Sequence, residues 1–201
     1  MTAVAAFDFD GTLTRRDTIV PFLCSVSGCR ALARGLPQAL PVVALRALGA
    51  LGATPAKERL FGIYLAGRPL PHVRRLATAF ARERLPALLR PAALSRLAWH
   101  RSRGHRCLVV TASPDLYIAP WARAQGLELI ASRLAVSAGG LLTGAHDGPV
   151  CEGREKASRL RAAIGERVGP IYAYGDSAGD REMLALADHA YFRRMPDPGE
   201  P

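Results

Sequence analysis

Lysine is almost absent from this basic sequence, and aromatic residues are few. Of 27 basic residues only Lys57 and Lys156 are lysines, and Phe, Trp and Tyr together make up 6%. The arginines are scattered through predicted helices and do not alternate with aromatic residues. We therefore interpret them mainly as solvated helix faces and do not expect nucleic acid as a partner. A net charge of +10 still favours an anionic substrate or surface, because arginine binds phosphate through two hydrogen bonds.

Metal-binding cysteine patterns are also absent. Cys24, Cys29, Cys107 and Cys151 form no CxxC pair and have no Cys/His spacing typical of a zinc site. Reduced thiols in a cytoplasmic protein are therefore expected. No secretory signal precedes the first predicted strand, which is consistent with that location.

No uninterrupted hydrophobic run reaches membrane-spanning length. Residues 30–52 are apolar and small, but Pro37, Pro41 and Arg46 interrupt them, so they make a poor transmembrane span. We expect a packed helical hairpin there. Peripheral contact with the inner face of a membrane through this block is the alternative, because arginines adjoin it. No feature indicates an oligomeric state.

The order of the predicted elements indicates an α/β protein. With 201 residues and 49% hydrophobic content, the chain can form one cored domain and a subdomain. Short apolar runs predict parallel strands, and glycines at 139 and 140 predict a hairpin. The predicted strands are 3–6, 106–110, 128–131, 171–174 and 189–192, and the predicted helices are 19–28, 54–67, 71–84, 86–103, 114–125, 153–164 and 178–187.

An all-helical block separates the first strand from the other strands. This pattern predicts a doubly wound parallel sheet with a Rossmann-like core and a small helical cap inserted after strand one. The predicted core comprises residues 1–14 and 86–201, and the predicted cap comprises residues 15–85.

The turn after the first strand carries two carboxylates. It reads Phe-Asp-Phe-Asp-Gly-Thr-Leu-Thr over residues 7–14. Because side chains alternate along a strand, Asp8 and Asp10 leave the same face. Two like charges this close repel each other and raise one pKa unless a cation lies near them.

Other strand ends supply the remaining parts of a phosphate site. Thr111 follows the second strand, Asp176 and Asp180 follow a later one, and Lys156 opens a helix. The carboxyl ends of parallel strands meet at one edge of a sheet. An oxygen-rich set without sulfur favours Mg²⁺ as the cation.

This residue set suits phosphoryl transfer. Asp8 can attack phosphorus and form an aspartyl-phosphate, while Asp10 protonates the leaving oxygen and later deprotonates water. Thr111, Lys156 and backbone N–H groups can bind the phosphoryl oxygens. Ser113 is the alternative to Thr111 as the phosphate-binding hydroxyl.

The motifs FDFDGTLT, LVVTASP, CEGREK and YAYGDSAGD occur in this order along the chain. In this it resembles the haloacid-dehalogenase superfamily, and within it subfamily IB, with its phosphoserine phosphatases and bacterial phosphatidylglycerophosphate phosphatases. The resemblance implies that Asp8 is nucleophile and Mg²⁺ ligand, and that Asp10 is acid/base and a ligand through its backbone carbonyl. It further implies that Thr111 and Lys156 hold phosphate, Asp176 binds Mg²⁺, and Asp180 supports the metal site.

Two departures concern substrate selection. Asp17 stands where phosphoserine phosphatases usually have a glutamate, and Ala112-Ser113-Pro114 replaces a glycine pair. We therefore expect a Mg²⁺-dependent phosphomonoester hydrolase for a small or lipid-linked substrate. A phosphoserine phosphatase specifically, a phosphotransferase and a non-catalytic binding protein are the alternatives. The cap residues expected to select the substrate are Asp17, Arg16, Phe22 and Arg68.

Overall fold

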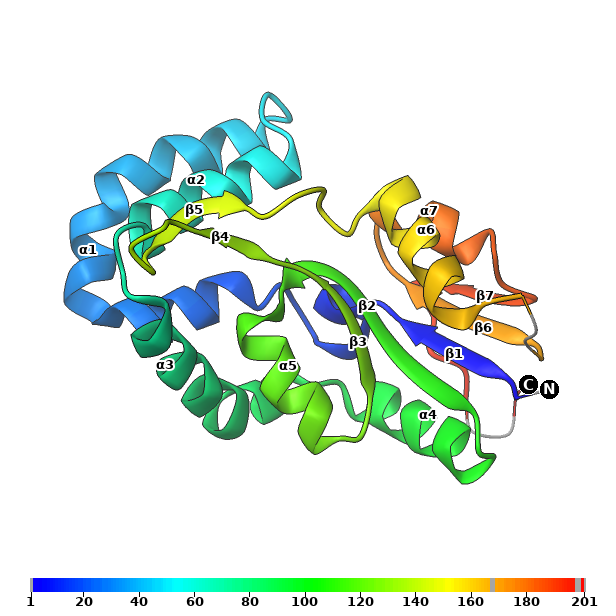
Figure 1. Cartoon of the computed structure of the whole chain (residues 1–201). Coiled ribbons are helices and arrows are strands. Elements are labelled where there is room, and N and C mark those ends of the chain that lie inside the picture. Colours follow the sequence, from blue (N-terminus) through cyan, green and yellow to red (C-terminus); the bar gives the residue numbers. More distant parts are fainter. Residues whose placement is uncertain (1, 167–168, 198–199, 201) are drawn as a thin grey trace.

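A five-stranded parallel sheet forms the centre of the molecule (Figure 1). The computed structural model describes residues 2–166, 169–197 and 200. Strand order is β3-β2-β1-β6-β7, so the first strand lies in the middle. The predicted doubly wound α/β core is confirmed. The strands are β1 (Val4–Phe7), β2 (Arg106–Pro114), β3 (Glu128–Ser132), β6 (Ile171–Gly175) and β7 (His189–Phe192).

Both faces of the sheet are covered because successive residues of its strands point to opposite sides. Ala5 and Phe7 join the core cluster shared with α4 (Pro91–Ser102) and α5 (Asp115–Ala124). Val4 and Ala6 join the cluster shared with α6 (Gly153–Ile164) and α7 (Arg181–Leu184). In Figure 1, α6 and α7 lie above the sheet, and α4 and α5 lie below it.

The helical block contains α1 (Ile19–Ala47), α2 (Ala53–Leu65) and α3 (Leu70–Glu83). Within α1, Gly28 has φ 75° and ψ 159°, which interrupts the helix. Figure 1 shows that the chain changes direction within α1. The hairpin predicted within residues 30–52 is wrong. The chain stays helical through Pro37 and Pro41 and turns only at Gly49, whose φ is 73°. The antiparallel neighbour of the second half of α1 is α2.

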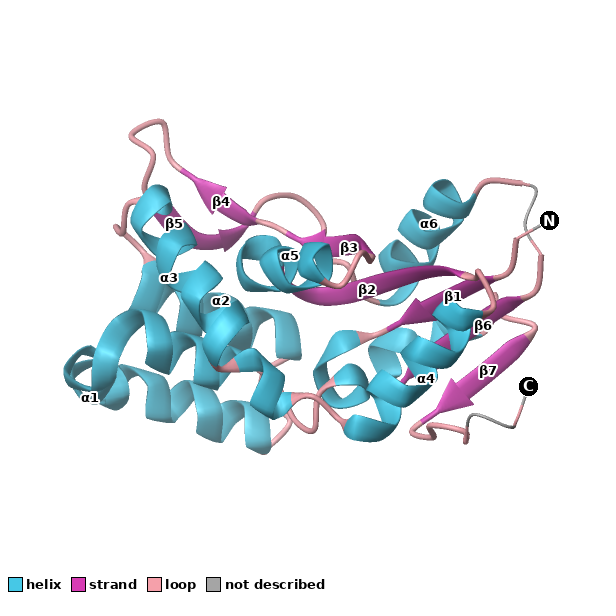
Figure 2. Ribbon diagram, turned by 90° about the horizontal axis from the view of Figure 1, so that it is seen from below, coloured by secondary structure: helices cyan, strands magenta, loops and turns pink. Residues whose placement is uncertain are grey.

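The strands β4 (Leu134–Val136) and β5 (Leu142–His146) form the expected antiparallel hairpin. It does not join the main sheet but lies on α2, beyond the end of β3 (Figure 2). Gly144 has φ 91°, and a Cβ there would be 2.5 Å from the Cα of Gly62 on α2. Two glycines therefore permit the backbones of hairpin and helix to touch.

Two predicted helices are shorter than expected. The helix expected over 86–103 is a 3₁₀ turn, Leu85–Leu88, followed by α4, because Arg90 before Pro91 is extended with ψ 123°. This break lets Leu89 bridge to Thr14, so the chain's entry to the helical block lies beside its exit. The helix expected over 178–187 is a 3₁₀ turn, Ala178–Asp180, and α7. None of the helices within the described residues is long and apolar enough to span a membrane.

Candidate active site

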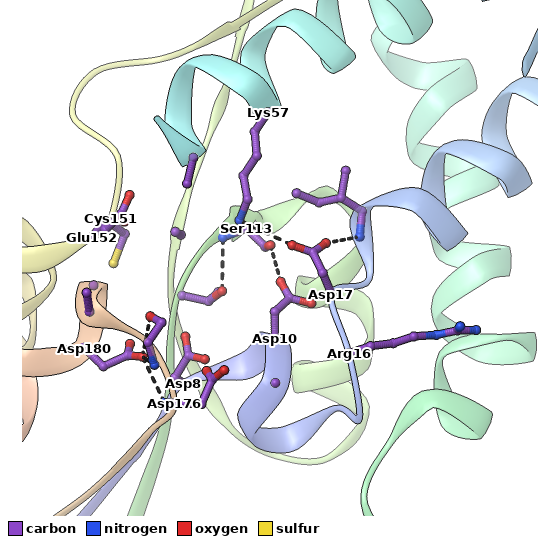
Figure 3. Close-up of a pocket in the computed structure, with 18 of the residues that line it drawn as sticks. Asp8, Asp10, Arg16, Asp17, Lys57, Ser113, Cys151, Glu152, Asp176 and Asp180 are labelled. Atoms are coloured by element: carbon purple, nitrogen blue, oxygen red, sulfur yellow. Dashed lines mark hydrogen bonds and ion pairs between the residues drawn. The ribbon is translucent and has the colours of Figure 1, made fainter. Parts of the chain in front are cut away.

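The predicted catalytic and phosphate-binding residues meet at the carboxyl edge of the sheet. Asp8 follows β1, Thr111 lies within β2, and Asp176 follows β6. A cavity of about 640 Å³ opens between this edge and the helices α1 and α2 (Figure 3). The residues that line this cavity include the six that the sequence predicts for catalysis, phosphate binding and the metal site: Asp8, Asp10, Thr111, Lys156, Asp176 and Asp180.

The turn that carries the carboxylates is a short irregular helix, Phe9–Leu13. It requires glycine at position 11, where φ is 81° and a Cβ would lie 2.3 Å from Oδ2 of Asp176. Thr12 Oγ1 donates a 3.3 Å hydrogen bond to Asp176 Oδ1. The turn therefore brings the ends of β1 and β6 into direct contact.

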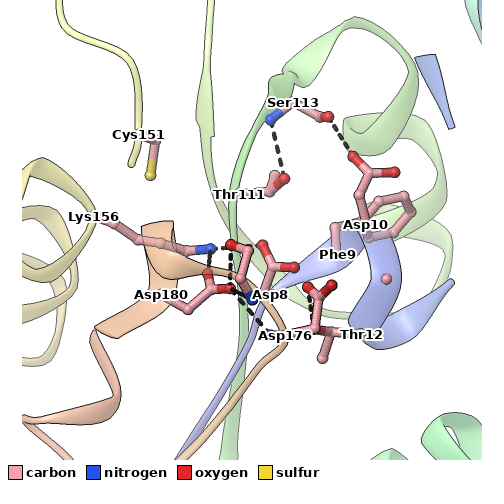
Figure 4. A network of polar contacts seen from close by, with 12 residues as sticks. Asp8, Phe9, Asp10, Thr12, Thr111, Ser113, Cys151, Lys156, Asp176 and Asp180 are labelled. Atoms are coloured by element: carbon pink, nitrogen blue, oxygen red, sulfur yellow. Dashed lines mark hydrogen bonds and ion pairs between the residues drawn. The ribbon is translucent and has the colours of Figure 1, made fainter. Parts of the chain in front are cut away.

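Lys156 is the buried cation of the site. It lies in the first turns of α6, and its Nζ donates to Asp8 Oδ1 at 2.6 Å and to Asp180 Oδ1 at 2.5 Å (Figure 4). Burial disfavours its charge, but the two carboxylates hold its pKa above the usual range. Lys156 is therefore an ammonium ion shared between two acids.

The pKa values of the carboxylates diverge within a few ångströms. Burial raises the pKa of Asp8 to about 7, against the attraction of Lys156. Burial also raises the pKa of Asp176, with a smaller contribution from Asp180. For Asp180, burial is outweighed by Lys156 and by hydrogen bonds from Ser177, so its pKa is lowered. When all three carboxylates are ionised, they carry more negative charge than Lys156 neutralises.

Both oxygens of Asp180 are already engaged. Oδ1 accepts from Lys156, and Oδ2 accepts from Ser177 N at 2.9 Å, Ser177 Oγ at 2.8 Å and Asp176 N at 3.1 Å. A Cβ at Gly175 would be 2.5 Å from Cβ of Asp180, so this packing also depends on a glycine. Asp180 is therefore placed to orient Lys156 and the turn around Asp176.

Oxygen atoms of Asp8, Asp176 and Asp180 lie within 4.8 Å of one another. An all-oxygen donor set with excess negative charge fits Mg²⁺. Because Asp180 is engaged elsewhere, Asp8 and Asp176 are the carboxylates available to a cation.

Asp10 points to a different part of the cavity. Its Oδ1 accepts from Thr18 N at 2.7 Å and Thr18 Oγ1 at 2.6 Å, and its Oδ2 accepts from Ser113 Oγ. Thr18 Oγ1 also lies 3.0 Å from the buried hydroxyl of Tyr117. Burial, and next the charge of Asp17, raises the pKa of Asp10. Figure 4 shows this carboxyl beside Ser113, apart from the Asp8 group.

The two candidate hydroxyls have different surroundings. Thr111 Oγ1 accepts from Ser113 N at 3.0 Å, and both side chains are 1% exposed. Both residues line the cavity, but Ser113 Oγ is bound to Asp10. Thr111 is therefore the hydroxyl whose hydrogen remains available to a phosphate oxygen.

Of the four predicted substrate-selecting residues, Arg16 and Asp17 line the cavity and two lie elsewhere. Phe22 is fully buried, with its ring 4.4 Å from that of Tyr117. Arg68 instead donates to the carbonyl of Val26 at 2.9 Å, beside the bend in α1. Both residues pack within the helical block, and neither lines the cavity in this arrangement.

The sequence reasoning missed two cations in the cavity wall. Lys57 extends from α2 to within 3.8 Å of Asp17 (Figure 3), and Arg46 comes from the last turn of α1. The rarity of lysine, which singled out Lys156, applied equally to Lys57. Nothing in the sequence shows that the bend in α1 returns Arg46 to the cavity.

Comparisons with known proteins agree with this geometry. The family model for haloacid dehalogenase-like hydrolases matches residues 5–185. Protein CicA of Caulobacter vibrioides (strain NA1000 / CB15N) is 40% identical over 94% of this chain and 85% of that protein. Phosphoserine phosphatase SerB2 of Mycobacterium tuberculosis is 32% identical over 90% of this chain, which spans 41% of that protein.

Solved structures share the fold. A protein of unknown function from Bordetella pertussis Tohama I has a TM-score of 0.77 and 26% identity, covering 93% of this chain and 87% of that chain. A substrate-bound phosphoserine phosphatase has a TM-score of 0.64 and 19% identity, covering 93% and 83%. The chain belongs to the haloacid dehalogenase-like hydrolases. Within that family, it is related to phosphoserine phosphatases.

Proposed function

We propose that this protein is a Mg²⁺-dependent phosphomonoester hydrolase that acts through an aspartyl-phosphate on Asp8. The observation that carries the proposal is the buried contact of Lys156 with Asp8 and Asp180, next to Asp176. No packing requirement explains three acids around one lysine at the floor of a cavity. A site that binds phosphate and a cation does.

Asp8 is the proposed nucleophile. Lys156 holds its Oδ1, which leaves Oδ2 to attack phosphorus. The new bond joins Oδ2 to phosphorus, and the bond from phosphorus to the leaving oxygen breaks. The phosphoryl oxygens would be bound by the Thr111 hydroxyl, the Lys156 ammonium and backbone N–H groups of the turn.

Asp10 is the proposed general acid and base. Thr18 and Ser113 fix its carboxyl from both sides, and its raised pKa favours the proton-carrying form. Asp10 can give this proton to the leaving oxygen and then take one from the water that hydrolyses the aspartyl-phosphate.

Asp8, Asp176 and the backbone carbonyl of Asp10 are the residues proposed to hold Mg²⁺. When bound, the cation reduces the repulsion between an anionic nucleophile and an anionic phosphate. Asp180 has a supporting role, because its carboxylate orients Lys156 and the turn at Ser177.

The proposed substrate is a small or lipid-linked phosphomonoester. The cavity wall opposite Asp8 carries Arg16, Asp17, Arg46 and Lys57, so a leaving group with polar or charged atoms is favoured. Phosphoserine is one such molecule, and relatives that are phosphoserine phosphatases support it. Transfer of the phosphoryl group to an alcohol instead of water uses the same residues.

The test is release of inorganic phosphate from an aryl phosphate with Mg²⁺ and with EDTA. Asp8→Asn should abolish turnover, whereas Asp147→Asn, at an exposed position outside the cavity wall, should not. Equal turnover in wild type and Asp8→Asn would refute the mechanism. A panel containing phosphoserine and phosphatidylglycerophosphate, with and without an added alcohol, separates substrate classes and detects transfer.

A further inference from the structure

The second half of α1 has an apolar outer face that the described residues leave uncovered. Leu36, Leu40, Val43 and Leu48 are 48%, 56%, 53% and 80% exposed. The first three recur at the four- and three-residue spacing of one helix face, and Leu48 follows at the helix end. We call these four residues the α1 outer face. In Figure 1 this half of α1 runs along the edge of the molecule farthest from the sheet.

These outer side chains are not needed to hold the helix in place. An adjoining side of the same half of α1 buries Ala39 and Val42. Gly35 is packed so closely that a Cβ there would lie 2.5 Å from Cε1 of Tyr64 on α2. The helix is therefore anchored through its inner side, and about half of the surface of Leu36, Leu40 and Val43 stays exposed.

The charge around the α1 outer face has one sign. No Asp or Glu occurs from residue 18 to residue 57, and this stretch contains Arg30, Arg34, Arg46 and Lys57. The three arginines are exposed. An apolar helix face bordered by arginine and free of acids is typical of helices that lie in the interface of an anionic bilayer. A solvated surface helix would normally carry acids as well.

We propose that the α1 outer face docks the protein on the surface of an anionic lipid bilayer. The four apolar side chains enter the boundary between headgroups and acyl chains, and the arginines contact lipid phosphates. Docking does not depend on the proposed hydrolase activity. Combined with that activity, it has a consequence for substrate. Arg46, in the last turn of the same helix, lines the active-site cavity, so docking would hold the cavity wall close to phosphorylated headgroups.

The experiment is co-sedimentation of the full chain with phosphatidylcholine vesicles that contain, or lack, phosphatidylglycerol. Binding should require phosphatidylglycerol and weaken with added salt. Leu40→Glu combined with Val43→Glu should lower the affinity at least about tenfold. Arg34→Gln should lower it about fivefold, the fold-change corresponding to about 1 kcal/mol for one arginine at an anionic surface. Phe192→Glu is the matched control, because Phe192 is 49% exposed on β7 and should not affect binding.

Three results would overturn the proposal. These are wild-type protein that does not sediment with phosphatidylglycerol vesicles, a Leu40→Glu/Val43→Glu variant that binds as wild type, and a stable dimer that this variant converts to monomer. The last would show that a second copy covers the face. Turnover of a soluble aryl phosphate by the variant should equal that of wild type. If the hydrolase proposal is wrong, the wild-type protein will not turn over the aryl phosphate. That outcome would leave the vesicle result unaffected.

Discussion

Asp8→Asn should stabilise the metal-free protein while it removes activity. Asp8 is 7% exposed, and burial raises the pKa of its carboxyl from 3.8 to about 7. Ionising this group therefore costs free energy in the folded state that it does not cost in the unfolded chain. An amide of the same shape keeps an acceptor for Lys156 without that cost. Residues that function requires often reduce stability in this way.

The size of the effect follows from the pKa. A shift of one unit corresponds to about 1.4 kcal/mol, so a shift of about three units costs about 4 kcal/mol once Asp8 is ionised in both states. The cost is absent below pH 3.8, grows between pH 3.8 and about 7, and is constant above. The substitution should thus raise the free energy of unfolding by about 4 kcal/mol at pH 8, but by less than half of that at pH 5.

The assay is thermal unfolding followed by circular dichroism in EDTA at both pH values. For a domain of this size, about 4 kcal/mol corresponds to a rise in Tm of about 10 °C. Asp180→Asn is the control with opposite sign. Its folded-state pKa is lowered, so its ionised form adds stability above the unfolded pKa, and the substitution should lower Tm at pH 8.

Two results would refute this reasoning. One is an Asp8→Asn protein whose Tm at pH 8 equals or falls below that of wild type. The other is a gain of equal size at pH 5 and pH 8, which would show that the stabilisation has no connection with the ionisation of Asp8.

Three further outcomes follow from the same geometry. Because the pKa of Asp8 is about 7 without metal, apparent Mg²⁺ affinity should fall about tenfold per pH unit below pH 7, and affinities by calorimetry that do not change between pH 6 and 8 would contradict this. Gly11→Ala should lower kcat/KM at least about 100-fold and weaken Mg²⁺ binding, because the Cβ of the alanine would displace Asp176. Kinetics equal to wild type would exclude that displacement. Thr18→Val removes one of the two hydrogen bonds to Asp10 Oδ1, so steady-state kinetics should show kcat lowered about 10-fold or more with KM little changed. An unchanged kcat would mean that this hydrogen bond is dispensable.

The sheet could be predicted because each of its strands is a short apolar run that ends in a turn residue. Asp176 was found for the same reason, because it directly follows a buried strand, whereas Lys156 was found because lysine is rare in this chain. Helix ends were less predictable. The break before Pro91 has a local signal, because a residue that precedes proline disfavours the helical conformation. The pairing of Leu89 with Thr14 that this break permits joins segments 75 residues apart, and propensity within a window of sequence does not contain that contact.

The cap residues were harder to place than the core residues. Helical periodicity shows that Phe22 lies on an apolar face, but it does not show whether that face borders the cavity or the interior. Tertiary packing decides the question, since Phe22 stacks on Tyr117, and beyond the bend at Gly28 the same helix brings Arg46 to the cavity. Lys57 was missed because its position depends on how α2 packs between α1 and the β4–β5 hairpin.

The hydrogen bonds from Thr18 to Asp10 couple the position of the helical block to the orientation of the proposed proton donor. If the block swings outward to admit substrate or release product, Thr18 must leave Asp10, whose carboxyl then loses two of its three partners. An open enzyme would therefore hold its acid in a poorly defined orientation. Stray water reaching the phosphorylated Asp8 would meet no aligned base. If the proposed mechanism holds, this linkage would couple the timing of proton transfer to enclosure of the substrate and would protect the proposed intermediate while the block is open.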